Sequence, residues 1–147
     1  MDLNHKFSQI SVFNKVSEIP TIIWKELECS SNLYFSSKYL EAIEKHNLHL
    51  SFFYIVLKNK DEKAIAFANI QIINFHLETI EKDTSNLFKK ITSIGRKLTI
   101  IPKEKPLTII NCGNSFVSGE HGVFIKKGEN KRLILRKISK SILHHTE

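Results

Sequence analysis

Two apolar segments joined by a short charged turn constrain this fold more than any other feature of the sequence. Residues 50–58 (LSFFYIVLK) and 64–77 (AIAFANIQIINFHL) are rich in aromatic and β-branched residues, which is typical of β-strands, and NKDEK between them predicts a hairpin turn. Alternation along the second segment places one set of side chains on each face: Ile65, Phe67, Asn69, Gln71, Ile73 and Phe75 against Ala64, Ala66, Ala68, Ile70 and Ile72. Because both faces are mainly apolar, we expect a central strand that is covered on both sides.

The other elements follow from helix caps, helical periodicity and short apolar runs. Ser17 and Pro20 indicate the start of a helix over residues 17–29, and Ser36 or Ser37 caps a second helix that ends near Asn47. The remaining segments predict strands at 8–13, at 107–112, which is short and buried, and at 122–127, which is an edge strand. They also predict helices at 81–98 and 131–145 and a proline-containing linker at 99–106. Helices alternating with buried strands indicate an α/β class, with α+β as the alternative, in one domain spanning residues 1–147.

The last predicted helix carries an apolar face for which the sequence offers no further strand. That face consists of Ile134, Leu135, Ile138 and Ile142. We therefore expect it to contact a second lobe or to mediate self-association. Its other face is basic, with Arg132, Arg136 and Lys140 spaced four residues apart.

The formal charge of +7 is concentrated in two segments. Residues 89–105 hold six basic side chains and one acidic one, and residues 126–147 hold seven basic and two acidic ones, a net +5 in each case. Such segments attract anions, although a solvated helix face is the simpler interpretation. Nucleic acid is not favoured as a partner, because no nucleic-acid-binding signature is present.

Several classes of protein are excluded by what the sequence lacks. Two cysteines do not make a disulfide framework, and no Cys/His cluster has the spacing of a metal site, so we expect no metal. The sequence has no signal peptide and no apolar run long enough to cross a membrane. We therefore expect a cytoplasmic protein.

The segment NCGNSFVSGEHGVF, residues 111–124, is the strongest candidate for a functional site. It contains Gly113, Gly119 and Gly122, which follow the predicted strand at 107–112. Glycines in this position can let backbone amides approach an anion, or can simply supply turns with positive φ. The spacing matches neither the dinucleotide-binding pattern nor the phosphate loop, so the sequence leaves both interpretations open.

Three side chains of this segment could carry chemistry. Glu120 or His121 could act as a general base, and Cys112 with His121 could form a nucleophile and base. The alternative without a chemical role is that Glu120 and His121 are polar residues of an exposed loop. Cys112 would then be a small apolar residue at the end of a buried strand.

One combination of segments resembles a known family. The helix IIWKELEC, its polar break and FSSKYLEAIEKHN are followed by the two apolar strands, and INCGNSFVSGEHGV then comes at the expected distance. Over residues 19–125 the chain resembles the N-terminal part of GNAT-like N-acyltransferases related to the Fem-type peptidoglycan aminoacyltransferases. The resemblance implies a mixed, largely antiparallel sheet flanked by helices.

The resemblance also implies a function and a cofactor. Family members transfer an acyl group to an amine, and acetyl-CoA or another acyl-CoA binds at a later strand-to-helix turn that carries Arg/Gln-x-x-Gly-x-Gly/Ala. This sequence lacks that motif and is shorter than typical members, so we expect an N-terminal lobe of a longer protein that is inactive alone. Within it we expect Glu120 and His121 to be catalytic, and Asn114 with Gly113, Gly119 and Gly122 to contact the amine substrate. The alternative function is a non-catalytic basic module that binds nucleic acid or a phosphate-bearing ligand.

Overall fold

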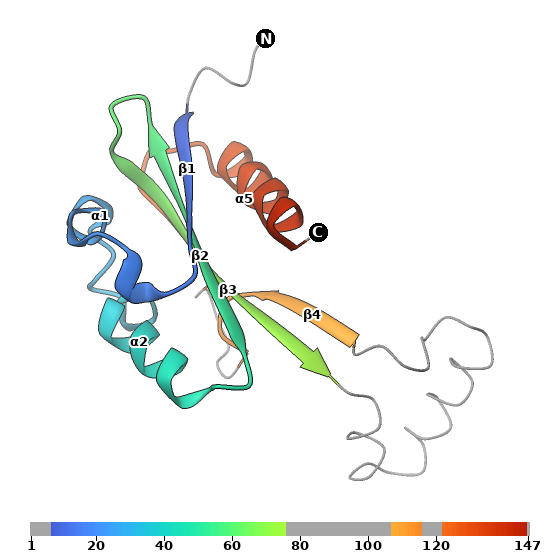
Figure 1. Cartoon of the computed structure of the whole chain (residues 1–147). Helices are drawn as coiled ribbons and strands as arrows, with labels where there is room; N and C mark the ends of the chain where they lie inside the picture. Colours follow the sequence, from blue (N-terminus) through green and yellow to red (C-terminus); the bar gives the residue numbers. More distant parts are fainter. Residues whose placement is uncertain (1–6, 76–106, 116–121, 147) are drawn as a thin grey trace, which may run out of the picture. The chain divides into compact units, whose positions relative to one another are not determined.

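The computed structural model describes residues 7–75, 107–115 and 122–146 (Figure 1). The elements in chain order are β1 (Phe7–Phe13), the 3₁₀ turn η2 (Val16–Glu18), α1 (Thr21–Leu27), the 3₁₀ turn η3 (Leu33–Phe35), α2 (Ser37–His46), β2 (Ser51–Asn59), β3 (Ala64–Phe75), β4 (Leu107–Cys112), β5 (Val123–Ile125) and α5 (Lys131–Thr146). The predicted α/β class, with an antiparallel sheet flanked by helices, is confirmed. The helix predicted at 81–98 and the linker at 99–106 lie outside the described residues.

Five strands form one sheet in the order β1–β2–β3–β4, and β5 pairs with β3 as well. The β2–β3 hairpin has the predicted turn at residues 59–63. There the side-chain Oδ1 of Asn59 accepts hydrogen bonds from the N–H groups of Asp61 and Lys63, at 3.0 Å each. Glu62 has a φ of 61°, in the left-handed region that such a tight reversal requires. The Asn side chain thus closes the turn by taking up two backbone donors.

Strand β2 has both of its faces covered. Tyr54 and Val56 point into a hydrophobic cluster with α1 and α2, whereas the ring of Phe53 lies 4.6 Å from that of His145 on α5. Because alternate residues of a strand face opposite sides, α5 packs on the face that α1 and α2 leave open. The strand β2 therefore lies in the middle of three layers, with α1 and α2 on one side and α5 on the other (Figure 1).

Phe67 of β3 is the centre of the cluster on the α1 and α2 side. Its ring contacts Trp24 at 5.1 Å, Tyr54 at 5.8 Å and Phe35 at 6.2 Å between centroids. Aromatic pairs at these separations add to the free energy of burying their surface. The prediction that Phe67 lies on a buried face of a central strand is confirmed, because its side chain is fully buried.

The first helix begins later than its sequence indicates. Residues 16–18 form a 3₁₀ turn, and α1 starts only at Thr21, after Pro20. A residue that precedes proline avoids the helical region, and Ile19 accordingly is extended, with φ −76° and ψ 118°. The prediction that Ser17 starts the helix is therefore wrong.

The second helix begins and ends as predicted. Ser36 is its N-cap, and the Ser36 hydroxyl accepts a hydrogen bond from the N–H of Tyr39 at 3.3 Å. Asn47 ends the helix, and its amide donates to the carbonyl of Ile43 at 2.9 Å. Both side chains satisfy backbone groups that a helix end leaves without partners.

The apolar face of α5 has a partner within the chain. Ile134 and Ile138 are buried and Ile142 is half-buried, whereas Leu135 is exposed. Since α5 packs against β2, the chain itself covers the two isoleucines that we expected to meet a second lobe or a second copy. Association through the face of Ile134, Leu135, Ile138 and Ile142 stays a prediction, for which Leu135 is the exposed residue.

The strand at 107–112 occurs where it is predicted, but it is not buried. Ile109 and Ile110 of β4, the last strand of the sheet order, are 41% and 38% exposed. The chain divides into two compact units, Met1–Gln71 with Asn111–Glu147, and Ile72–Ile110. In the second unit the hydroxyl of Thr108 donates to the side chain of Asn74 at 2.8 Å. The single-domain expectation stays a prediction.

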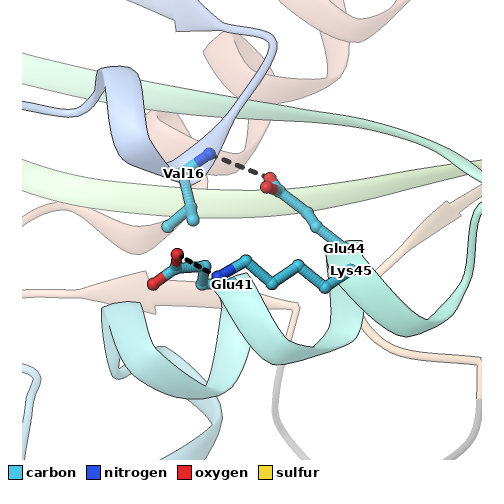
Figure 2. A network of polar contacts seen from close by, with 4 residues as sticks. All are labelled: Val16, Glu41, Glu44 and Lys45. Atoms are coloured by element: carbon cyan, nitrogen blue, oxygen red, sulfur yellow. Dashed lines mark hydrogen bonds and ion pairs between the residues drawn. The ribbon is translucent and has the colours of Figure 1, made fainter.

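Glu44 of α2 joins three elements of the first unit. Its Oε1 accepts a hydrogen bond from the N–H of Val16 at 2.8 Å (Figure 2). The same oxygen accepts another from the Tyr54 hydroxyl at 2.7 Å. The neighbouring Lys45–Glu41 pair, 2.8 Å apart, lies on the exposed side of the same helix and contributes little to stability. The Glu44 contacts instead connect η2, α2 and β2 at one carboxylate oxygen.

Tyr54 should make the stability of the chain sensitive to high pH. Burial, the hydrogen bond to Glu44 and the charge of Glu44 all raise the pKa of Tyr54 above its usual range. Since the unfolded chain deprotonates first, the contribution of Tyr54 is complete below about pH 10 and falls by about 1.4 kcal/mol per pH unit above it. Urea unfolding of wild type and Tyr54→Phe from neutral pH upward measures this. Wild type should lose free energy of unfolding more steeply above that pH, and parallel curves would contradict the assignment.

Candidate functional site

The peptide group of Asn69 marks the place where the strand beside β3 is interrupted. The N–H of Gly113 donates to the Asn69 carbonyl at 2.8 Å, and the N–H of Asn69 donates to the Gly122 carbonyl at 2.9 Å. In a regular antiparallel ladder both bonds would go to a single opposite residue. Gly113 and Gly122 therefore meet the same residue of β3, and β5 continues with Val123 opposite Ala68. The segment that these two glycines delimit, residues 113–122, is called the excursion below.

Gly113 and Gly122 hold the two ends of this excursion for different reasons. Gly113 has a φ of 123°, a conformation that other residues rarely adopt. At position 122 only glycine fits, because a Cβ there would collide with the carbonyl group of Cys112 and approach the nitrogen of Gly113. The two chain segments thus approach each other closely at the base of the excursion.

A group of buried polar side chains lies at that base. Asn69, Gln71 and Asn114 are 3%, 0% and 3% exposed. The Oε1 of Gln71 accepts from both the N–H and the hydroxyl of Ser115, at 2.9 Å each, and the Asn114 amide donates to the Tyr39 hydroxyl at 2.8 Å. The residues come from α2, β3 and the start of the excursion, so the group connects helix and sheet.

Asn111 makes further hydrogen bonds to the first residues of the excursion. Its amide nitrogen lies 3.3 Å from the carbonyl oxygen of Gly113 and 3.1 Å from the hydroxyl of Ser115. Ser115 is therefore held by Gln71 from β3 and by Asn111 from the end of β4. These contacts fix the first residues of the excursion.

Two atoms of this group have no hydrogen-bond partner in the described part of the chain. They are the Oδ1 of Asn69, an acceptor, and the Nε2 of Gln71, a donor. Leaving a buried polar atom without a partner costs about 1–3 kcal/mol, so such atoms in a folded protein need an explanation. Asn69 and Gln71 are two residues apart on β3 and share a face, which places an acceptor and a donor on the same side of the sheet.

The structure brings together half of the predicted site residues. Gly113, Asn114 and Gly122 all lie at the base of the excursion, and Asn114 is engaged with Tyr39. Gly119, Glu120 and His121 lie outside the described residues, so their roles stay predictions. The sequence analysis did not identify Asn69 and Gln71 as site residues. The signal was present, since they are the two amides on an otherwise apolar face of the second strand.

The cysteines do not form a reactive centre in the described residues. Cys112 ends β4 as expected, but its side chain is exposed rather than buried. Desolvation by the surrounding chain nevertheless raises the pKa of the Cys112 thiol, and burial raises that of Cys29, so neither environment favours a thiolate. No group of three potential metal ligands occurs in residues 7–75, 107–115 and 122–146.

The strand-to-helix turn after β5 is the second feature with the potential to bind an anion. Gly128 has a φ of 91°, and the side chain of Asn130 caps α5 by accepting from the N–H of Leu133 at 3.1 Å. The ammonium group of Lys126 donates to the carbonyl of Glu26 at 2.6 Å, which anchors the turn to the end of α1.

Replacing Gly122 tests the close approach at the base of the excursion. Gly122→Ala should lower the free energy of unfolding by about 1–3 kcal/mol, because the new methyl group meets backbone atoms that cannot yield without moving the strand. Gly128→Ala is the matched control, since no atom lies within 4 Å of its Cβ and only the positive φ opposes it, at about 1 kcal/mol. Urea unfolding of both variants should rank Gly122→Ala as the more destabilising. The reverse order would show that the excursion is not held this tightly.

Comparison with known proteins adds no assignment to this geometry. No family model, no curated protein and no solved structure matches the chain.

Proposed function

We propose that this chain is the amine-binding lobe of a GNAT-like N-acyltransferase, with acetyl-CoA or another acyl-CoA as donor. The observation that carries the proposal is the meeting of Gly113 and Gly122 at Asn69, beside amide atoms of Asn69 and Gln71 that have no partner among the described residues. The order of elements also supports it, since two helices precede an antiparallel hairpin and a strand-to-helix turn follows the excursion.

The two unpartnered atoms suit the two groups that acyl transfer must position. The Asn69 Oδ1 can accept a hydrogen bond from the N–H of the attacking amine, and the Gln71 Nε2 can donate to the acyl carbonyl oxygen. A donor aimed at that oxygen stabilises the negative charge that develops as the tetrahedral intermediate forms. Because both atoms are buried, the reacting groups must take the place of the side chains that cover them.

The proton balance of the reaction requires a base that an amide cannot provide. The amine nitrogen forms a bond to the acyl carbon, the carbon–sulfur bond of the thioester breaks, and the thiol leaves with a proton. Glu120 or His121 would remove the proton from the amine, since both belong to the excursion that begins at Gly113 and ends at Gly122. In this proposal Glu120 and His121 are the catalytic residues and Asn114 positions Tyr39.

Gln71→Glu removes the Nε2 donor from the proposed site. Glutamate keeps the oxygen that accepts from Ser115 but replaces the Nε2 donor, so kcat/KM should fall by about 10²–10³-fold. The assay is release of CoA thiol from acetyl-CoA with a panel of primary amines, on this chain and on the full-length protein that contains it. Gln9→Glu on the exposed part of β1 is the control and should leave the rate unchanged.

The proposed base is tested in the same assay. A Glu120→Ala, His121→Ala double variant should lose turnover, because the attacking amine would keep its proton. Wild-type turnover by this variant would remove the assignment of both residues. The proposal itself fails if the full-length protein releases no thiol with any amine of the panel and shows no thermal shift with CoA.

A further inference from the structure

The outward face of α5 is basic. The helix runs from Lys131 to Thr146 and contains no acidic residue. Arg132, Arg136 and Lys140 are exposed on the side opposite the buried Ile134 and Ile138. These cations follow one another every four residues, so they form a continuous stripe along the helix.

Exposed leucines accompany these cations. Leu143 is 60% exposed and follows Lys140 by three residues and Arg136 by seven, which places it on the same stripe. Leu135 is 45% exposed and precedes Arg136 on the edge of the stripe. Cations attract anionic headgroups, and large exposed apolar side chains beside them can enter the boundary below, so this side of α5 offers both groups to a membrane surface.

We propose that the outward face of α5 docks on the surface of an anionic lipid bilayer. The cationic stripe, formed by Arg132, Arg136 and Lys140, is complementary to phosphate headgroups, and Leu135 and Leu143 enter the boundary between headgroups and acyl chains. This is binding on the membrane and not through it, because no helix of residues 7–75, 107–115 and 122–146 is long and apolar enough to cross a bilayer.

The leucines favour lipid over nucleic acid as the occupant. Phosphates of a nucleic acid would pair with the cations alone and would leave Leu143 in water, whereas an acyl-chain boundary removes it from water. The helix also contains no aromatic Phe, Tyr or Trp side chain on which a base could stack. The inference does not depend on the proposed acyl transfer.

Vesicle sedimentation tests the proposal directly. The purified chain should sediment with phosphatidylcholine vesicles that contain phosphatidylglycerol and remain in solution with phosphatidylcholine alone, and the binding should weaken as salt rises. Arg132→Gln, Arg136→Gln, Lys140→Gln together should reduce the affinity at least about tenfold. The matched control removes the same charge from the hairpin, with Lys58→Gln, Lys60→Gln and Lys63→Gln, and should stay within about twofold of wild type.

Leu143→Ser distinguishes a bilayer from a polyanion. It should weaken binding to the anionic vesicles by several-fold and leave any binding to heparin or duplex RNA unchanged. Absence of binding to anionic vesicles would overturn the proposal. Equal losses in the α5 triple variant and the hairpin control would overturn it too, as would an unaltered vesicle affinity in Leu143→Ser. Circular dichroism of each variant verifies that the fold is retained.

Discussion

The two backbone hydrogen bonds of Asn69 are the constraint on which the rest of the candidate site depends. Its N–H donates to the Gly122 carbonyl and its carbonyl accepts from the Gly113 N–H, so both ends of the excursion meet one residue of β3. Phe67, two residues earlier on β3, is enclosed by rings from α1, η3 and β2. The two bonds of Asn69 therefore lie next to the best-packed part of this strand.

Polar contacts connect that strand to the helices that cover it. The Tyr39 hydroxyl on α2 accepts from Asn114, and one turn further along α2 Glu44 accepts from Val16 and from Tyr54 of β2. The same helix therefore fixes both the N-terminal segment and the start of the excursion. This explains how residues from distant parts of the sequence can form one site without a metal or a disulfide among the described residues.

Sequence reasoning succeeded where a local signal decides the structure and failed where tertiary contacts decide it. The β2–β3 hairpin follows from alternation and from the side chain of Asn59, and the limits of α2 follow from Ser36 and Asn47. The exposure of β4 and the packing of α5 against β2 depend on which elements meet in the folded chain. A short stretch of sequence does not contain that information. Asn69 and Gln71 were placed on the correct face, but an alternation pattern does not tell which buried amide lacks a partner.

The energetics of the two amides give the strongest reason to regard this place as functional. A buried amide with an unpartnered atom costs about 1–3 kcal/mol, whereas an apolar side chain of similar size at the same position would be neutral or stabilising. Most of the neighbouring positions on β3 are apolar, so the strand tolerates such side chains. Gln71 uses its Oε1 for Ser115, and among the described residues its Nε2 has no partner. The proposed amine and acyl groups would supply the partners that Asn69 and Gln71 lack there.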